Sequence, residues 1–253
     1  MILATSSRYE RRAAAFCGRL TPELLLPART PGGGGLFYRT PVVAGVSGTI
    51  TVYSDYVCPF CYLGRKSLAD YQATRAAGEK LDVDWRPFDL RSRQRRPDGT
   101  VDDSVDSGKD EAYYEAAREN VERLREAYGA DEMSVDLVED VDGFLAQVAS
   151  LYVSEEHPEE WLAFDEAVFA ALWEDGRDVG DRDVLADVAT DVGLDGEAIR
   201  DVVDDEDWRD RLRDEFADAR ESGVMGVPTF VYDGHGARGA VPPSQLERLV
   251  EGA

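Results

Sequence analysis

A strand-like run that leads straight into two cysteines constrains the fold of this chain more than any other feature. Residues 49–55 (TITVYSD) alternate β-branched and polar side chains, a pattern typical of a β-strand. Cys58 and Cys61 follow at once, and from Cys61 onward apolar residues recur at helical spacing. The sequence therefore predicts a strand that runs into a helix whose first turn carries the motif Cys-Pro-Phe-Cys.

The rest of the chain predicts a small α/β layer interrupted by helices. Residues 110–223 are helical almost throughout, and in their first helix Tyr113 and Val121 share one amphipathic face. The other predicted elements are a strand at 81–90, a polar break at 91–100, a strand at 227–234 that ends in an Asp-Gly turn, a short strand around 237–241 and a helix at 243–253. A strand–helix–strand unit at one end and a hairpin–helix unit at the other would form one sheet covered by helices.

This order predicts three regions. A discontinuous α/β domain takes residues 48–100 and 224–253, and residues 101–223 form an all-helical insertion between its two halves. Residues 1–47 differ from everything downstream, because they contain six Arg against two Glu and a run of glycines. We interpret them as a disordered extension or the product of a misplaced start. An export signal and a small functional arm are the alternatives.

The charge of the chain is extreme and its make-up is unusual. There are 52 acidic against 28 basic residues, a net charge of −24, and only three lysines. An acidic surface poor in lysine stays hydrated at high salt, and salt screens its self-repulsion, so we expect a halophilic protein. The same charge argues against binding to nucleic acid or to an anionic membrane. No apolar run approaches the length of a membrane span.

Four interpretations of the cysteine pair compete. A zinc site needs about four ligands, and neither Cys17 nor the two histidines have ligand spacing with the pair. A structural disulfide across two residues closes too small a loop to stabilise much, and two inert core cysteines are a third alternative. The favoured interpretation is a redox-active dithiol, with no metal and no other cofactor. So few cysteines also suit a reducing compartment, and we expect a cytoplasmic protein.

The position of the pair predicts different roles for its cysteines. Cys58 is expected at the helix N-terminus, where unpaired backbone N–H groups and the helix dipole stabilise a thiolate. Pro59 fits the first turn, where no N–H is needed. Phe60 adds no positive charge, so we expect a less oxidising couple than one with histidine there. Cys61, one turn further, is expected to be buried with a higher pKa. Cys58 would attack the substrate sulfur, and Cys61 would resolve the mixed disulfide.

Two further segments are candidates for the same site. Asp55 precedes the cysteines and has two interpretations: a buried carboxylate that accepts the Cys61 proton, or a polar cap of the turn between strand and helix. Far along the chain, residues 223–230 (GVMGVPTF) place Pro228 directly before a strand, behind glycines that permit a close approach. On its own such a proline is an ordinary strand start.

Three segments together resemble a known family: residues 54–68 (SDYVCPFCYLGRKSL), 166–185 (EAVFAALWEDGRDVGDRDVL) and 223–246, which hold VPTF and the closing turn. They resemble the DsbA-like thioredoxin superfamily, and in particular its FrnE-like branch. That branch shares its scaffold with 2-hydroxychromene-2-carboxylate isomerases and kappa-class glutathione transferases. The resemblance spans roughly residues 49–252, so the first 47 residues lie outside it.

The resemblance implies a thioredoxin-like α/β fold with a large helical insertion, a redox centre made by Cys58 and Cys61, and a cis peptide bond at Pro228. Val227 would present its backbone to an extended substrate chain. The substrate-binding residues that it implies are Pro59, Phe60, Val227 and Pro228. The isomerase and transferase relatives usually carry serine in place of Cys58, so the two cysteines favour dithiol chemistry.

The main hypothesis is therefore a cytoplasmic protein-disulfide oxidoreductase or isomerase. Its partners would be protein or low-molecular-weight thiols and a further thiol reductant or oxidant. A small-molecule isomerase or glutathione-transferase-like enzyme, with Cys58 alone essential, is the alternative on the same scaffold. A third hypothesis is a chaperone-like module whose helical insertion holds unfolded chains.

Overall fold

The computed structural model describes residues 48–96, 98–135 and 140–252. The extension predicted at residues 1–47, and Cys17 within it, lie outside these ranges. Within them, no helix combines the length and the apolar character needed to cross a membrane.

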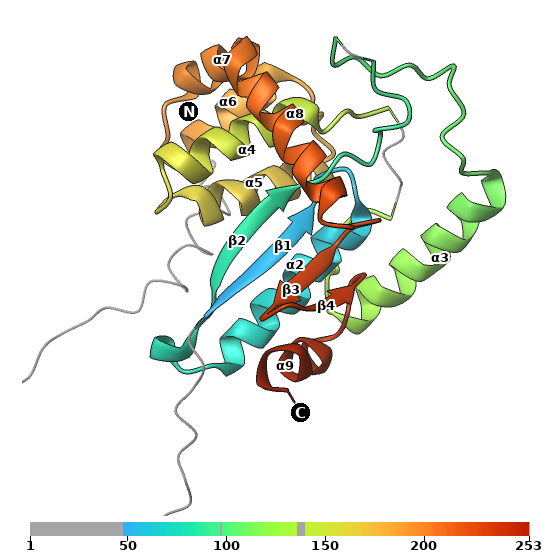
Figure 1. The fold of residues 1–253 in the computed structure, drawn as a ribbon, viewed down its shortest axis with the longest axis vertical. Helices are drawn as coiled ribbons and strands as arrows, with labels where there is room; N and C mark the ends of the chain where they lie inside the picture. The colour runs from blue at the N-terminus through green and yellow to red at the C-terminus, as the bar shows by residue number, and fades with distance from the viewer. Residues whose placement is uncertain (1–47, 97, 136–139, 253) are drawn as a thin grey trace, which may run out of the picture. The chain divides into compact units, whose positions relative to one another are not determined.

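A mixed four-stranded sheet forms the centre of the described chain (Figure 1), with strand order β2-β1-β3-β4. β1 (Thr49–Ser54) and β2 (Asp82–Pro87) are parallel, as expected for strands joined through a helix. β3 (Thr229–Tyr232) runs antiparallel to β1, although some 170 residues of chain separate them, and places Phe230 opposite Val52. β4 (His235–Arg238) completes the hairpin. The thioredoxin-like α/β fold predicted from the sequence is confirmed.

The second strand of the hairpin begins two residues earlier than the sequence predicts. Asp233 and Gly234 both have positive φ, 46° and 74°, which is the geometry of a two-residue hairpin turn. The partner strand therefore starts immediately after the turn, and β4 occupies 235–238 rather than the region around 237–241.

Helices occupy most of the remaining chain, largely where the sequence predicts them. Their bounds are α2 (Pro59–Thr74), the short 3₁₀ helix η1 (Ala77–Glu79), α3 (Glu111–Ala127), α4 (Phe144–Glu156), α5 (Trp161–Trp173), α6 (Arg182–Asp191), α7 (Gly196–Asp204), α8 (Glu206–Glu221) and α9 (Pro243–Glu251). α5 follows a turn that contains Pro158, in which the backbone N–H groups of Glu160 and Trp161 both donate to the His157 carbonyl.

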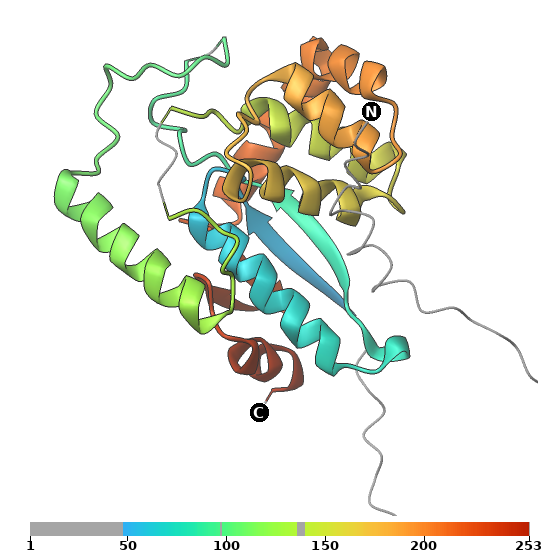
Figure 2. The same ribbon diagram turned by 180° about the vertical axis from the view of Figure 1, so that it is seen from behind.

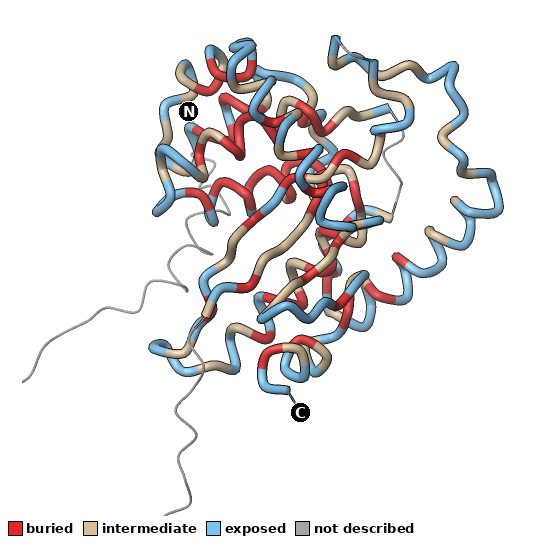
Figure 3. Tube along the Cα trace, viewed as in Figure 1, coloured by how far each residue is buried: buried red, intermediate tan, exposed pale blue. Residues whose placement is uncertain are grey.

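One core lies between the sheet and the helices α2 and α9. It joins Ile50 of β1 and Phe230 of β3, both fully buried, to Leu68 and Tyr71 of α2 and Leu246 of α9. The alternation of the strands thus buries one apolar row against these two helices. Figure 3 shows this burial as red segments along the centre of the fold.

The helices between β2 and β3 do not form one body. α4 to α8 gather beside β2, whereas α3 lies apart from them along α2 in both views (Figures 1 and 2). Val121 and Leu124 of α3 are buried, and the Tyr128 hydroxyl donates to the carbonyl of Ala240, 2.6 Å away, in the segment between β4 and α9. α3 is thereby attached to the α/β layer.

Gly64 allows α2 to approach the segment before β3. A Cβ atom at this position would lie 2.9 Å from Pro228 Cγ and 3.2 Å from the ring of Phe230. Both neighbours belong to packed structure rather than to the end of a flexible side chain, so even one methyl group would force them apart.

The variant Gly64→Ala is expected to lower the free energy of unfolding by up to about 2 kcal/mol. Helix propensity alone would raise it by about 1 kcal/mol, but crowding against Pro228 costs about 1–3 kcal/mol. Urea unfolding measures the change. Gly78→Ala, where a new Cβ meets no atom within 4 Å, is the control and should not destabilise. A Gly64→Ala protein more stable than wild type would contradict the packing.

Candidate redox site

The turn after β1 places Cys58 at the N-terminus of α2. β1 ends at Ser54, and Cys58 is the N-cap residue, in extended backbone conformation, with Pro59 as the first helical residue. The Cys58 N–H donates to the Asp55 carbonyl, 3.1 Å away, and the Cys61 N–H donates to the Cys58 carbonyl, 2.9 Å away. The helix dipole therefore points its positive end at the Cys58 sulfur, which favours an anion there.

Cys61 lies one helical turn further on and is buried, as predicted. Both cysteines are free thiols and both are buried: Cys58 is 4% exposed and Cys61 2%. Burial raises the pKa of the Cys61 thiol well above its ordinary value, and the neighbouring Cys58 sulfur raises it further. The backbone of Asp55 and the Ser54 hydroxyl oppose this shift by hydrogen bonding to the sulfur. The higher pKa predicted for the inner cysteine is confirmed in direction.

The VPTF segment meets the cysteine turn across the sheet. The peptide bond between Val227 and Pro228 is cis, and the Val227 carbonyl lies 3.6 Å from Cys58 Sγ, within hydrogen-bond reach of the thiol. Pro228 is buried and lies directly before β3. The two motifs, distant in sequence, are thus in contact in the structure because β1 and β3 are neighbours.

Asp55 is a buried carboxyl group behind this turn. Its Oδ1 accepts from the Val57 N–H at 3.2 Å, and its Oδ2 accepts from the Leu90 N–H at 3.0 Å. Burial raises the pKa of Asp55 to about 7, and the charges of Asp89 and Asp142 add to the shift, while the two hydrogen bonds oppose it. Asp55 therefore caps the turn, which was one of its two predicted roles. Transfer of the Cys61 proton to its carboxylate remains a prediction.

Gly143 closes the site above Asp55. A Cβ atom at Gly143 would lie 2.9 Å from Asp55 Oδ1 and 3.3 Å from a methyl carbon of Val57. The N-terminal end of α4 can therefore cover the carboxyl group only through a residue without a side chain. This close approach excludes bulk water from one side of Asp55.

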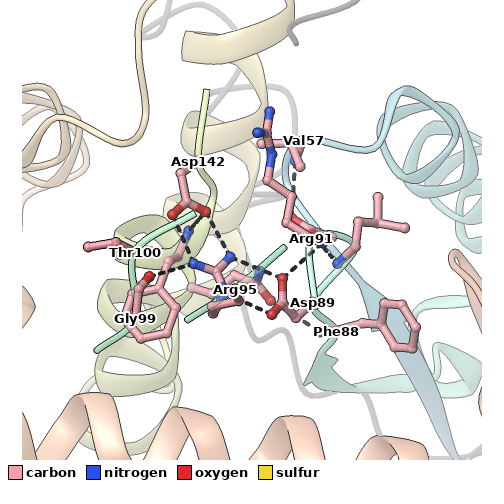
Figure 4. Close-up of polar contacts among 12 residues, drawn as sticks. Val57, Phe88, Asp89, Arg91, Arg95, Gly99, Thr100 and Asp142 are labelled. Carbon is pink, nitrogen blue, oxygen red and sulfur yellow. Dashed lines mark hydrogen bonds and ion pairs between the residues drawn. The ribbon is translucent and has the colours of Figure 1, made fainter. Parts of the chain in front are cut away.

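A buried ion-pair network holds the loop that supplies Leu90. Arg95, whose side chain is 8% exposed, binds both carboxylate oxygens of Asp89 at 2.7 and 3.0 Å and both of Asp142 at 2.9 Å (Figure 4). Its guanidinium also donates to the Gly99 carbonyl at 2.8 Å. Within the predicted polar break at 91–100, Arg95 thus pairs internally instead of facing solvent. The loop is thereby fixed beside Asp55.

A second buried network joins the turn to α5. The Tyr56 hydroxyl donates to Ser150 at 2.7 Å and also lies 3.1 Å from Asp165, which forms an ion pair with Arg65 of α2. The indole N–H of Trp173 donates to the Tyr56 carbonyl at 2.8 Å. Helices of the block between β2 and β3 therefore hold the residues on either side of the cysteines.

An open groove of about 500 Å³ leads to Cys58. Of the predicted site residues, Cys58, Pro59, Phe60 and Val227 line it, although Cys58 itself is only 4% exposed. Asp55, Cys61 and Pro228 are also buried and are not part of its wall. The wall also contains residues that sequence reasoning did not assign to a site: Arg91, Lys109, Tyr113, Tyr114, Trp173 and Arg238.

The missed residues come from segments that the sequence assigns to other roles. Tyr113 was placed on the amphipathic face of a helix, together with Val121. In the structure Val121 is fully buried but Tyr113 is 50% exposed, because the first turns of α3 extend beyond α2 and face the groove. The change from aliphatic to tyrosine side chains along that face was the available signal. Within the described ranges, no group of three or more His, Cys, Asp or Glu side chains is arranged to hold a metal ion.

Comparison with known proteins agrees with this geometry. A family model described as the DSBA-like thioredoxin domain matches residues 49–251. The chain belongs to the DsbA-like thioredoxin family. YwbO, an uncharacterized protein of Bacillus subtilis, is 26% identical over 204 residues, which are 79% of this chain and 94% of YwbO.

Two solved structures illustrate the range of proteins with this DsbA-like fold. A probable DsbA oxidoreductase from Streptomyces coelicolor has a TM-score of 0.63 at 24% identity, covering 79% of this chain and 87% of that chain. A 2-hydroxychromene-2-carboxylate isomerase has a TM-score of 0.64 at 20% identity, covering 79% and 92%. The family resemblance drawn from the motifs is confirmed, and both kinds of relative named there share the fold.

The variant Asp55→Asn is expected to change how the stability of this DsbA-like protein depends on pH. The folded-state pKa of Asp55 is about 7 against an ordinary value of 3.8, so the unfolded chain loses this proton at lower pH than the folded one. This group therefore lowers stability as the pH rises from about 4 to 7, by up to about 1.4 kcal/mol per pH unit.

Urea unfolding across this pH range tests the assignment. The free energy of unfolding of Asp55→Asn minus that of wild type should rise between about pH 4 and pH 7 and then level off. The exposed Asp131, changed to Asn, is the control and should give a difference that does not rise. A flat difference for Asp55→Asn would show that Asp55 titrates normally.

The variant Arg95→Met should lower the free energy of unfolding by about 3–5 kcal/mol, because it leaves the buried Asp89 without its counter-charge. Arg182→Met is the control: its pair with Asp204 has side chains 54% and 49% exposed, so the loss should be under about 1 kcal/mol. Equal losses in the two variants would show that the Arg95 network contributes no more than a surface pair.

Proposed function

We propose that this DsbA-family protein is a cytoplasmic thiol–disulfide oxidoreductase or isomerase that uses Cys58 and Cys61 as a redox pair. The observation that supports it best is the arrangement around Cys58. Its sulfur lies at a helix N-terminus, on the wall of a groove and beside the Val227 carbonyl, with the buried Cys61 one turn behind it. Cys58, although only 4% exposed, lines the groove where a substrate would bind, and Cys61 lies behind it for the second step.

The reaction has two exchange steps in the reducing direction. The Cys58 thiolate attacks one sulfur of a substrate disulfide, the substrate S–S bond breaks, and the departing sulfur takes up a proton as a thiol. The Cys61 thiolate then attacks Cys58 Sγ, releases the second substrate thiol and leaves a Cys58–Cys61 disulfide. Two electrons pass from the pair to the substrate, and two thiols of the cell, or one dithiol, return them and become a disulfide. Oxidation of a substrate is the same sequence reversed.

Asp55 is proposed to take part in the second step. Because Cys61 has a raised pKa, it needs a proton acceptor before it can attack. A carboxyl group with a pKa of about 7 is suited to accept and return a proton near neutral pH. The contact between Cys61 and the backbone of Asp55 supports their proximity, and a shift in the pH profile of the resolving step in Asp55→Asn is the corresponding expectation.

Substrate chains are proposed to lie along Val227. In an added-strand arrangement, an extended peptide would pair with the backbone of this residue while its sulfur faces Cys58. Pro59 and Phe60 line the same groove and would contact the substrate on the other side of the sulfur. These roles follow from the family resemblance and from the position of the groove.

A small-molecule isomerase or thiol-conjugating enzyme is the second candidate. The observation that favours it is the aromatic and basic wall of the groove, which includes Tyr113, Tyr114 and Trp173 and is typical of a site for a compact ligand. The similarity to a 2-hydroxychromene-2-carboxylate isomerase in fold is consistent with it. In that enzyme Cys58 would act alone.

Single-cysteine variants separate the two candidates. In a Cys17→Ser background, which leaves only the two site thiols, Cys61→Ser should accumulate mixed disulfides with a disulfide-bonded protein substrate such as insulin. It should also lose turnover by roughly two orders of magnitude or more, because the two thiols act as a unit. Non-reducing gels and a coupled reductase assay at high salt measure both effects, and Cys58→Ser is the control that should do neither. Full turnover by Cys61→Ser, without trapped mixed disulfides, would favour the small-molecule enzyme in which Cys58 acts alone.

A further inference from the structure

Two cations flank the groove at Cys58 in a chain that is otherwise strongly acidic. Lys109 lies just before α3, and Arg238 is the last residue of β4, so they come from different segments and line the same groove as Cys58. The chain has only three lysines and a net charge of −24. A lysine and an arginine beside the reactive sulfur therefore differ from the surface as a whole.

Neither cation has a carboxylate partner among the residues that the structure describes. The Lys109 ammonium lies 5.6 Å from the centre of the Tyr113 ring, over its face. The Arg238 side chain is exposed, and its guanidinium lies over Gly226, where a Cβ atom would be 2.8 Å from Nη2. By contrast, Lys66 pairs with Asp70 at 3.5 Å on α2.

The acidic residues of the groove do not neutralise these two groups. Asp103 lies 3.7 Å from Arg91 and forms an ion pair with it. Asp140 is the second carboxylate of the wall, and neither Lys109 nor Arg238 forms an ion pair with it. Among the residues that the structure describes, the wall carries three basic and two acidic side chains, Arg91, Lys109 and Arg238 against Asp103 and Asp140. Its charge has the opposite sign to that of the whole protein.

Lys109, Arg238 and Cys58 all lie around Tyr113, a further residue of the groove wall. Tyr113 lies under the influence of both Cys58 and Arg238. Partial burial is the largest cause that raises the pKa of its phenol, the Cys58 charge raises this pKa further, and the Arg238 charge lowers it. The same ring carries the Lys109 ammonium on its face. Because Lys109 and Arg238 line the same groove as Cys58 and have no carboxylate partner among the described residues, both are available to a carboxylate on a ligand bound there.

We propose that the groove selects low-molecular-weight thiols and disulfides that carry carboxylates near the sulfur, with Lys109 and Arg238 as the residues that recognise them. This inference rests on the proposed exchange at Cys58 and names its substrate class. A volume of about 500 Å³ suits a small ligand rather than a folded chain. The overall negative charge opposes anion binding at low salt. At about 1 M salt the Debye length falls to about 3 Å, so that repulsion is screened while direct ion pairs persist in part.

Three small disulfides that differ in charge test the proposal. They are 3,3′-dithiodipropionate with two carboxylates, hydroxyethyl disulfide with none, and cystamine with two ammonium groups. Each is mixed in excess with reduced Cys17→Ser protein at about 1 M salt, where long-range fields are screened, and oxidation is followed by stopped-flow fluorescence. Each rate constant is divided by that of the same disulfide with free 2-mercaptoethanol, which removes differences in intrinsic reactivity.

The expected order of normalised rates is anionic, then neutral, then cationic, with the anionic disulfide ahead of the neutral one by roughly twofold to fivefold, the effect of an exposed ion pair. Lys109→Gln and Arg238→Gln should each reduce this ratio, and the double variant should abolish it. Lys66→Gln removes one positive charge on α2 outside the groove and should keep the wild-type ratio.

The outcomes separate this inference from the function on which it rests. If all three disulfides oxidise the pair but cystamine reacts as fast as or faster than dithiodipropionate, the selectivity is wrong while thiol–disulfide exchange stands. A ratio that falls equally in Lys66→Gln also overturns it, because the effect is then one of net charge. If none of the three disulfides oxidises the pair, the exchange function fails and the substrate class fails with it.

Discussion

The site depends on the close approach of the Val227–Pro228 segment to the first turn of α2. β1 and β3 are hydrogen-bonded neighbours, so the turn after β1 and the residues before β3 meet at one end of the sheet. Gly64 leaves room for Pro228 against the helix, and the Val227 carbonyl comes within 3.6 Å of Cys58 Sγ. Without this approach the groove would lack one wall, and the Cys58 sulfur would have no Val227 carbonyl beside it.

Buried polar groups fix the position of Asp55 behind the turn that carries Cys58. Asp55 is held by two backbone N–H groups, one of them in a loop fixed by the ion pairs of Arg95. Leaving such groups unpaired in a low-dielectric interior is costly, so each partner constrains the position of the next. The helices between β2 and β3 contribute through Trp173 and Asp165, which hold the residues beside the cysteines. These helices therefore hold the residues of the site in place, in addition to extending the α/β fold.

The parts of this structure that the sequence predicts well are those that depend on local sequence patterns. The strand into Cys58, the Asp-Gly turn of the last hairpin and the burial of Cys61 follow from alternation, turn chemistry and helix position. The groove wall does not, because it depends on where α3 lies, and an amphipathic helix does not specify which neighbour covers its ends. Lys109 and Arg238 are joined only by tertiary structure. The Arg95 network was equally hidden, since charge alone does not distinguish a buried arginine from a solvated one.

The reduction potential of the Cys58–Cys61 couple tests the central claim most directly. Cys17→Ser protein would be equilibrated at high salt in thiol–disulfide buffers of graded potential, and its free thiols then alkylated and counted by mass. We predict one reversible two-electron transition between about −150 and −280 mV. Because Phe60 adds no positive charge beside Cys58, the value should lie below the roughly −120 mV of the most oxidising relatives. Two cysteines that react with the buffer independently, with no shared disulfide at any potential, would contradict the dithiol mechanism.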